Sequence, residues 1–153
     1  MKSFLNVNQI KEDKESLEKW GSDWTNGFDV APSAIVFPET NKQVQSLIQY
    51  AIDSKRKIVP SGGRTGLSGG AVASDGEIVV SFDRMNKILD FDPQDKIVTC
   101  QAGVITESLQ NFAAEKGLYY PVDFASSGSS QIGGNVATNA GGIKVIRLSL
   151  IHI

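Results

Sequence analysis

The stretch from Pro60 to Gly70, which we call the glycine loop, most constrains what this chain can fold into. It has five glycines in eleven residues and follows the apolar pair Ile58–Val59. Glycine accepts positive φ and lacks a Cβ, so consecutive N–H groups can converge on one anion. Arg64 adds a positive charge. Three hydroxyl groups are further donors: Ser61, Thr65 and Ser68. The loop predicts a phosphate site, against the alternative of a turn-rich connection.

The chain length and the net charge limit the class of ligand. The 153 residues are enough for one ordinary domain, in which we expect one core. The formal net charge is −2, with no block of basic residues. Nucleic-acid binding by phosphate neutralisation therefore has little support, and we expect a small ligand.

Cysteine usage and hydropathy suggest the compartment. Cys100 is the single cysteine, so no internal disulfide can form, and the first residues lack the apolar run of a signal peptide. No stretch reaches the roughly 18 apolar residues of a membrane span. We expect a cytoplasmic protein without a membrane span, in which Cys100 is a small core residue rather than a nucleophile.

The chain up to the glycine loop predicts a helix over Gln9–Trp20 and a buried strand at Ala34–Phe37. A second helix is expected to begin at Thr40, whose side chain can cap it. Lys57–Pro60 is the next predicted strand, with the glycine loop at its end. The apolar face of the second helix comprises five residues: Val44, Leu47, Ile48, Ala51 and Ile52.

After the glycine loop, the pattern predicts a core strand at Glu77–Phe82 and a hairpin of Leu89–Asp92 with Lys96–Gln101. A third helix is expected to follow Thr106 as its N-cap and to stop at Gly117. The order of elements is typical of a mixed fold with a strand–helix–strand unit at its start.

A second glycine stretch, Ser126–Gly142, has five more glycines and no charge. A flexible linker is one interpretation, because Gly/Ser runs are usually flexible. Against it, Ile132, Val136 and Ala140 recur every four residues and predict a short helix whose N-terminus could bind an anion. Two anion-suited stretches about seventy residues apart favour one extended ligand, such as a dinucleotide.

Two common nucleotide motifs are absent. The glycine loop lacks the Gly-Lys-Ser/Thr of a nucleoside-triphosphate P-loop. It also does not match Gly-x-Gly-x-x-Gly at the start of a helix with an acidic residue about twenty positions on, as a Rossmann unit requires. The ligand is therefore expected to be bound in another way.

The glycine loop, Pro121–Asp123 and Ile132–Gly142 together resemble the FAD-binding domain of vanillyl-alcohol oxidase or PCMH-type flavoproteins. Within that superfamily the sequences of these motifs are most similar to those of the FAD-linked D-2-hydroxyacid dehydrogenases. The resemblance extends over about Ser33–Arg147. It implies an α+β, PCMH-type fold, with a small βαβ lobe and a mixed-sheet lobe with flanking helices, incomplete at the C-terminus.

The resemblance also implies a division of the chain. Residues 1–32 would be an N-terminal helical extension, and residues 33–147 a partial PCMH-type FAD-binding domain. The last six residues, 148–153, do not resemble the family and correspond to one reading frame of a transposon-end adaptor used in DNA library preparation. We expect them to be a non-native tail of a truncated chain.

The family pattern implies which residues contact FAD. Those around the FAD diphosphate would be Pro60, Ser61, Gly62, Gly63, Arg64, Thr65, Gly66, Leu67 and Ser68. Those lining the flavin side would be Gly128, Ser129, Gly133, Gly134, Asn135, Thr138, Asn139 and Gly142, with Pro121 nearby and Gly103 passing close to the cofactor. Neither histidine nor cysteine occurs in the matching stretches, so noncovalent FAD is implied.

The implied activity is oxidation of a 2-hydroxyacid to a 2-oxoacid by hydride transfer to flavin N5. This chain would supply FAD binding and no catalytic residue or metal ligand, and alone it is expected to be inactive. The substrate would bind a C-terminal domain not included here, and the electron acceptor is unidentified. The alternatives are a noncatalytic flavin- or nucleotide-binding module, a structural domain without cofactor, or another oxidoreductase of the superfamily.

Overall fold

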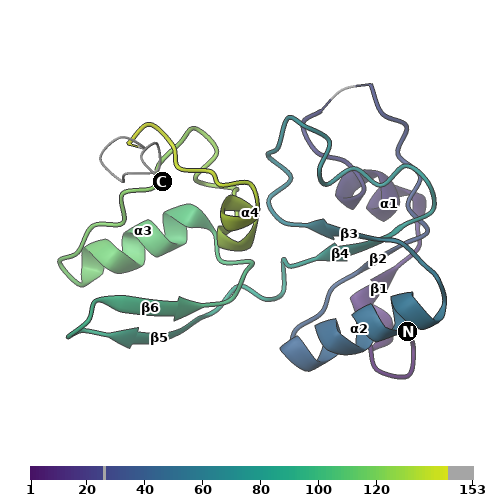
Figure 1. Ribbon diagram of the computed structural model, residues 1–153, viewed down its shortest axis with the longest axis horizontal. Helices are drawn as coiled ribbons and strands as arrows, with labels where there is room; N and C mark the ends of the chain where they lie inside the picture. Colours follow the sequence, from purple (N-terminus) through teal and green to yellow (C-terminus); the bar gives the residue numbers. More distant parts are fainter. Residues whose placement is uncertain (26, 145–153) are drawn as a thin grey trace. The chain divides into compact units, whose positions relative to one another are not determined.

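The computed structural model describes residues 1–25 and 27–144. The chain divides into two compact units, the first spanning Met1–Met85 and the second beginning at Asn86 (Figure 1). The expectation of a single core is therefore wrong. Chain length cannot reveal this division, because it limits the size of a domain and not the number of compact units that a chain forms. The predicted tail, residues 148–153, lies outside the described residues.

The first unit contains a four-stranded mixed sheet, in the order β1 (Ile10–Lys11), β2 (Ala34–Val36), β4 (Ile78–Ser81) and β3 (Ile58–Ser61). β2, β4 and β3 are parallel, and β1 is antiparallel to β2. All residues of β2 and β4 are buried, as their continuous apolar runs predict for parallel strands covered on both faces. These strands lie where the sequence predicted them.

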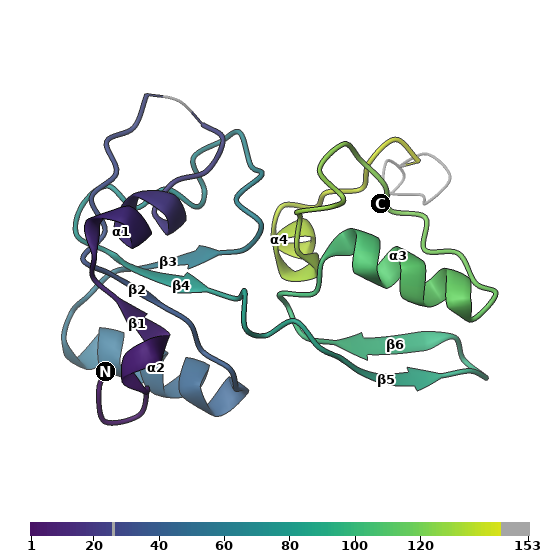
Figure 2. The same ribbon diagram turned by 180° about the vertical axis from the view of Figure 1, so that it is seen from behind.

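Helix α2 (Asn41–Asp53) covers one face of this sheet, and α1 (Lys14–Trp20) lies on the other (Figures 1 and 2). The predicted cap of α2 is confirmed, because Thr40 Oγ1 accepts the Gln43 N–H at 3.2 Å. The predicted apolar face is only partly buried. Leu47 and Ala51 enter the core, whereas Ile48 and Ile52 are largely exposed.

The N-terminal segment differs from the predicted helix over Gln9–Trp20. A 3-10 turn, η1 (Val7–Gln9), and the short strand β1 come first, and α1 begins only at Lys14. Asp13 caps α1 by accepting the Ser16 N–H at 2.9 Å, and this bond lowers the pKa of the Asp13 carboxyl. Residues before position 32 thus contribute a strand to the sheet as well as a helix.

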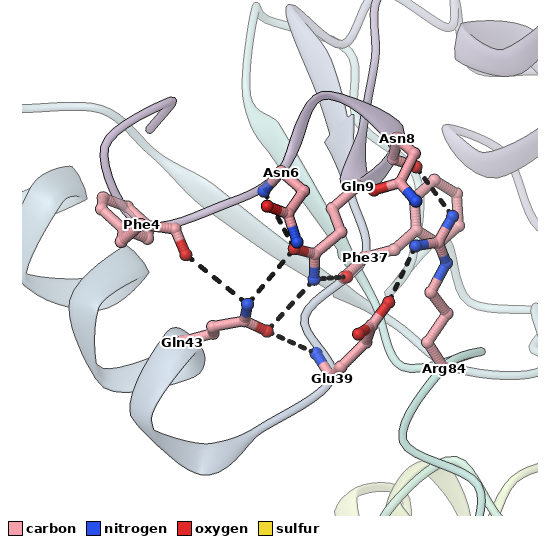
Figure 3. A network of polar contacts seen from close by, with 8 residues as sticks. All are labelled: Phe4, Asn6, Asn8, Gln9, Phe37, Glu39, Gln43 and Arg84. Carbon is pink, nitrogen blue, oxygen red and sulfur yellow. Dashed lines mark hydrogen bonds and ion pairs between the residues drawn. The ribbon is translucent and has the colours of Figure 1, made fainter.

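The side chain of Gln9 fixes the N-terminal segment to the sheet (Figure 3). Gln9 is fully buried, and its Nε2 donates to the Phe37 carbonyl at 2.9 Å and to Gln43 Oε1 at 3.1 Å. Its Oε1 accepts the Asn6 N–H at 3.0 Å. A buried amide is tolerated only when its polar atoms are paired, and here they join three separate segments of the first unit.

The second unit contains the hairpin of β5 (Ile88–Asp92) with β6 (Ile97–Cys100), together with α3 (Thr106–Glu115) and α4 (Ile132–Ala137). The hairpin and both helices are confirmed. Phe91 of β5 meets Phe112 of α3 edge-on, with ring centroids 5.8 Å apart. No helix within residues 1–25 and 27–144 is long and apolar enough to span a membrane.

The predicted N-cap of α3 is wrong by one residue. Ile105 occupies the cap position, and Thr106 lies inside the helix. The Thr106 hydroxyl instead contacts Ser130 Oγ at 2.7 Å and accepts the Asn135 side-chain N–H at 2.7 Å. These buried hydrogen bonds connect α3 to α4. They also explain why the Thr106 hydroxyl does not cap α3.

Candidate functional site

The glycine loop leaves the carboxyl end of β3, the edge strand of the parallel sheet in the first unit. Pro60 and Ser61 belong to the strand, with Ser61 opposite Ser81 of β4. A proline is tolerated there because an edge strand has one side without a ladder partner. Ligands of open α/β sheets bind outside the carboxyl ends of the strands, which is where this loop lies.

The glycine loop has unused donors. Among described residues, the backbone amides of positions 62–68 have no hydrogen-bond acceptor. The Ser61 hydroxyl is fully buried and likewise lacks a partner there. An unpaired buried hydroxyl such as that of Ser61 is costly, and the amides of residues 62–68, which belong to half-buried or exposed residues, are open to the same acceptor. Oxygen atoms of a diphosphate are suitable acceptors, so the residues present fit that group.

Arg64, which the sequence predicts as a positive charge at the phosphate site, also makes contacts within the first unit. Its Nη1 donates to the Gly62 carbonyl at 2.8 Å and lies 3.5 Å from Asp83 Oδ1. Arg64 also adopts a left-handed conformation, with φ of 58°. The guanidinium therefore ties one turn of the loop together, and Asp83 compensates part of its charge. The neutral amides remain the main donors toward a ligand.

The second glycine stretch lies in the second unit and is closely packed. A Cβ on Gly133 would lie 2.7 Å from the Ala102 Cβ, and one on Gly142 would overlap the Asp123 carbonyl. Gly142 also has φ of 74°. A flexible linker would not need such close approaches, so the linker interpretation is wrong for this stretch.

The N-terminus of α4 is less available to an anion than its sequence predicted. The Ile132 N–H donates to the Val104 carbonyl at 2.9 Å, and the Gly133 N–H to the Ala102 carbonyl at 2.8 Å. Gly134 is different, because a Cβ there would meet nothing within 4 Å. The open surface at Gly134 is suited to a flat group in contact with the backbone.

The remaining predicted residues of the second unit vary in exposure. Asn135 is buried, with its side-chain amide directed to Thr106. The Thr138 hydroxyl donates to the Gly134 carbonyl at 2.9 Å, and Asn139 is exposed with φ of 52°. Others are placed as follows: Gly103 buried, Pro121 partly exposed, and Gly128 and Ser129 exposed. Asn135 thus has a structural bond whether or not it also contacts a ligand.

Two polar residues near these stretches were missed by sequence reasoning. Asp83 balances Arg64, and Ser130 joins the buried hydrogen bonds of Thr106. Neither has a local signal, since each partner is distant in sequence. Cys100 is half-buried, and partial burial raises the pKa of its thiol, which favours the protonated form.

Comparison with known proteins identifies the family. Residues 32–152 match the family model described as FAD binding domain. The chain is 57% identical over 150 residues to a D-2-hydroxyglutarate dehydrogenase of Stutzerimonas stutzeri (strain A1501), covering 98% of this chain and 32% of the relative. It is 39% identical over 140 residues to a putative mitochondrial D-lactate dehydrogenase of Schizosaccharomyces pombe, covering 92% of this chain and 27% of the relative. The chain thus spans about a third of the length of these relatives.

The fold agrees with the family match. An alkyldihydroxyacetonephosphate synthase superposes with a TM-score of 0.86 at 25% identity, over 95% of this chain and 32% of that one. The α+β, PCMH-type fold that the sequence implied is therefore confirmed, and FAD is the cofactor of the matched family. By its sequence and its fold, the chain belongs to the FAD binding domain family.

Proposed function

We propose that the full-length protein oxidises a D-2-hydroxyacid, with D-2-hydroxyglutarate as the first candidate, to the 2-oxoacid, and that this chain supplies FAD binding. The observation that carries the proposal is the glycine loop, whose unpaired amides and buried Ser61 hydroxyl are available to an acceptor such as a diphosphate. The choice of substrate is supported by the name of the 57% identical relative.

Each unit would contribute a different contact. In the first unit, the amides of residues 62–68 and the hydroxyl of Ser61 would donate to the diphosphate. In the second unit, the glycines of Ser126–Gly142 would let the flavin approach the backbone, with Gly134 as the most open position. These stretches contain no histidine or cysteine, so they would hold FAD without a covalent bond.

When bound, FAD supplies the acceptor for the hydride that leaves the substrate Cα. The described residues provide binding, orientation and exclusion of water, while groups that bind the substrate carboxylate and accept the hydroxyl proton are expected in the rest of the protein. The electron acceptor that reoxidises the cofactor is also expected to bind there. We further propose a cytoplasmic location, on the grounds that the single cysteine forms no disulfide.

The test uses the full-length protein, purified with its bound cofactor. We expect flavin absorbance that is bleached anaerobically by D-2-hydroxyglutarate and not by its L-enantiomer. D-lactate is the second substrate to test, given the name of the Schizosaccharomyces pombe relative. Bleaching by neither acid, with flavin present, would favour a noncatalytic flavin module. A colourless protein whose Tm does not change with added FAD would reject FAD binding itself.

Replacing Ser61 by alanine should separate stability from cofactor binding. Because the buried hydroxyl has no protein partner among described residues, its loss should leave the stability of the apoprotein unchanged or raise it by about 1 kcal/mol. If the hydroxyl donates to the diphosphate, FAD affinity should fall about tenfold. Flavin fluorescence titration and denaturant unfolding measure the two effects.

The control is Ser33→Ala, which removes a hydroxyl bonded to the Glu77 carbonyl at 3.2 Å, away from the glycine loop. It should weaken the fold slightly and leave FAD affinity unchanged. Equal FAD affinity of the Ser61→Ala and wild-type proteins would mean that Ser61 does not contact the cofactor.

A further inference from the structure

Residues 20–25 precede the matched family region, which begins at position 32, yet they bond to Gly69 of the glycine loop directly and reach Arg64 through Asp83. Their contacts all lie within the first unit. They therefore form a support for the loop that the family match does not include.

The first contact runs through Trp20. Its indole Nε1 donates to Asp83 Oδ2 at 2.7 Å, while the other oxygen of Asp83 lies 3.5 Å from Arg64 Nη1. Arg64 in turn holds the Gly62 carbonyl, and its guanidinium lies 5.9 Å from the Trp20 ring centroid. Trp20 thus orients the carboxylate of Asp83, and this carboxylate attracts Arg64 of the loop. Residues behind a binding loop can fix its conformation through such contacts.

The second contact runs through Thr25. Its Oγ1 accepts the Gly69 N–H at 2.8 Å and so fixes this end of the glycine loop, where Gly69 has φ of 72°. Asp23 Oδ1 accepts the Thr25 N–H at 2.8 Å and so orders the threonine. The Gly21 carbonyl accepts the Ala73 N–H at 2.9 Å, just beyond the loop.

These contacts leave the amides of residues 62–68 unpaired while holding the segments on either side of them. A binding loop that is ordered before its ligand arrives loses less conformational entropy on binding. We propose that Trp20 and Thr25 are positioning residues for the glycine loop, acting through Asp83 and Gly69 to keep its amides in the shape that binds FAD. The proposal rests on the proposed FAD-binding role of the loop.

The test compares four substitutions in the full-length apoprotein. Trp20→Phe removes the indole donor and keeps an aromatic ring against Phe37, with which Trp20 packs edge-on at 5.2 Å. Thr25→Val removes the acceptor at nearly constant volume. Each should weaken FAD binding about tenfold, measured by fluorescence titration at a temperature where every variant is folded. Thr25→Ser keeps the hydroxyl and should restore the wild-type affinity.

Trp24→Phe is the matched control, because Trp24 is 61% exposed in the same segment and, among described residues, forms no hydrogen bond, ring contact or cation–π contact with the loop. It should leave FAD affinity unchanged. A purely structural role would lower Tm in Trp20→Phe or Thr25→Val without changing the FAD affinity of the folded protein, and that result would overturn the proposal.

Hydrogen exchange at the bonded amides on either side of residues 62–68 tests the proposal in the apoprotein without the cofactor; these are the Gly69 N–H, held by Thr25, and the Phe82 N–H, held by the Ser61 carbonyl. Exchange should be faster in Trp20→Phe and Thr25→Val than in Trp24→Phe and the wild type. Unchanged exchange would overturn the positioning role. A wild-type protein that binds no FAD would instead reject the proposed function, while the exchange rates would still decide whether residues 20–25 order the loop.

Discussion

Alanine at Gly142 is expected to destabilise the second unit by about 3–4 kcal/mol, because the new Cβ would overlap the Asp123 carbonyl oxygen and lie 2.8 Å from its carbon. About 1–2 kcal/mol of this arises from the left-handed backbone, at φ of 74°. The rest is the cost of separating two backbone segments that form a bridge between Asp123 and Gly142. Denaturant unfolding of the full-length apoprotein, followed by hydrogen exchange in the second unit, measures the loss.

Gly117→Ala is the matched control for Gly142→Ala. Gly117 has φ of 69°, but a Cβ there would meet nothing within 4 Å. Its replacement should therefore cost only the backbone strain, about 1–2 kcal/mol. If both variants lose the same stability, the close approach of Gly142 to Asp123 does not exist in the protein.

The adjacent pair Gly133 and Gly134 should respond to alanine in opposite ways. Gly133→Ala forces α4 away from Ala102, whose Cβ and carbonyl oxygen would lie 2.7 and 3.1 Å from the new methyl, and should cost about 1–3 kcal/mol. Gly134→Ala has open space and should raise stability by about 0.5–1 kcal/mol, because alanine favours a helix over glycine.

In Gly134→Ala, FAD affinity should not rise with the stability of the protein. If the flavin lies against the backbone there, the added methyl should weaken FAD binding about tenfold or more, although the protein becomes more stable. Fluorescence titration of the folded apoprotein measures this. Wild-type affinity in Gly134→Ala would remove Gly134 from the cofactor contacts.

Local sequence signals were sufficient for much of the fold. The apolar runs of β2 and β4 are continuous because parallel strands are buried on both faces. Thr40 followed by Gln43 is a complete capping signal within four residues. The position of the glycine loop at the end of a strand was also predicted correctly, because a high density of glycine after an apolar run favours the end of the strand.

The features that were missed depend on partners far along the chain. β1 consists of two residues among charges, and it forms only because Ile10 pairs with Val36. Thr106 has the residue type of an N-cap at the start of a predicted helix, but its hydroxyl is bonded to Ser130 and Asn135 instead. Ile48 and Ile52 follow the helical period, yet their exposure depends on how far the sheet extends beneath α2.

Sequence reading was also incomplete for the charge at the glycine loop. Arg64 was predicted as a positive charge for a phosphate, and the structure adds a counter-ion, Asp83, nineteen positions later. A charge in a motif does not reveal its counter-ion, since the counter-ion is chosen by the fold.

The location of every support of the glycine loop within Met1–Met85 has a consequence for synthesis on the ribosome. Domains fold as units, the N-terminal one first, while the chain emerges at roughly 5–20 residues per second. Trp20, Thr25 and Asp83 all emerge before the second glycine stretch, so the nascent chain can assemble the loop while the second unit is still being translated.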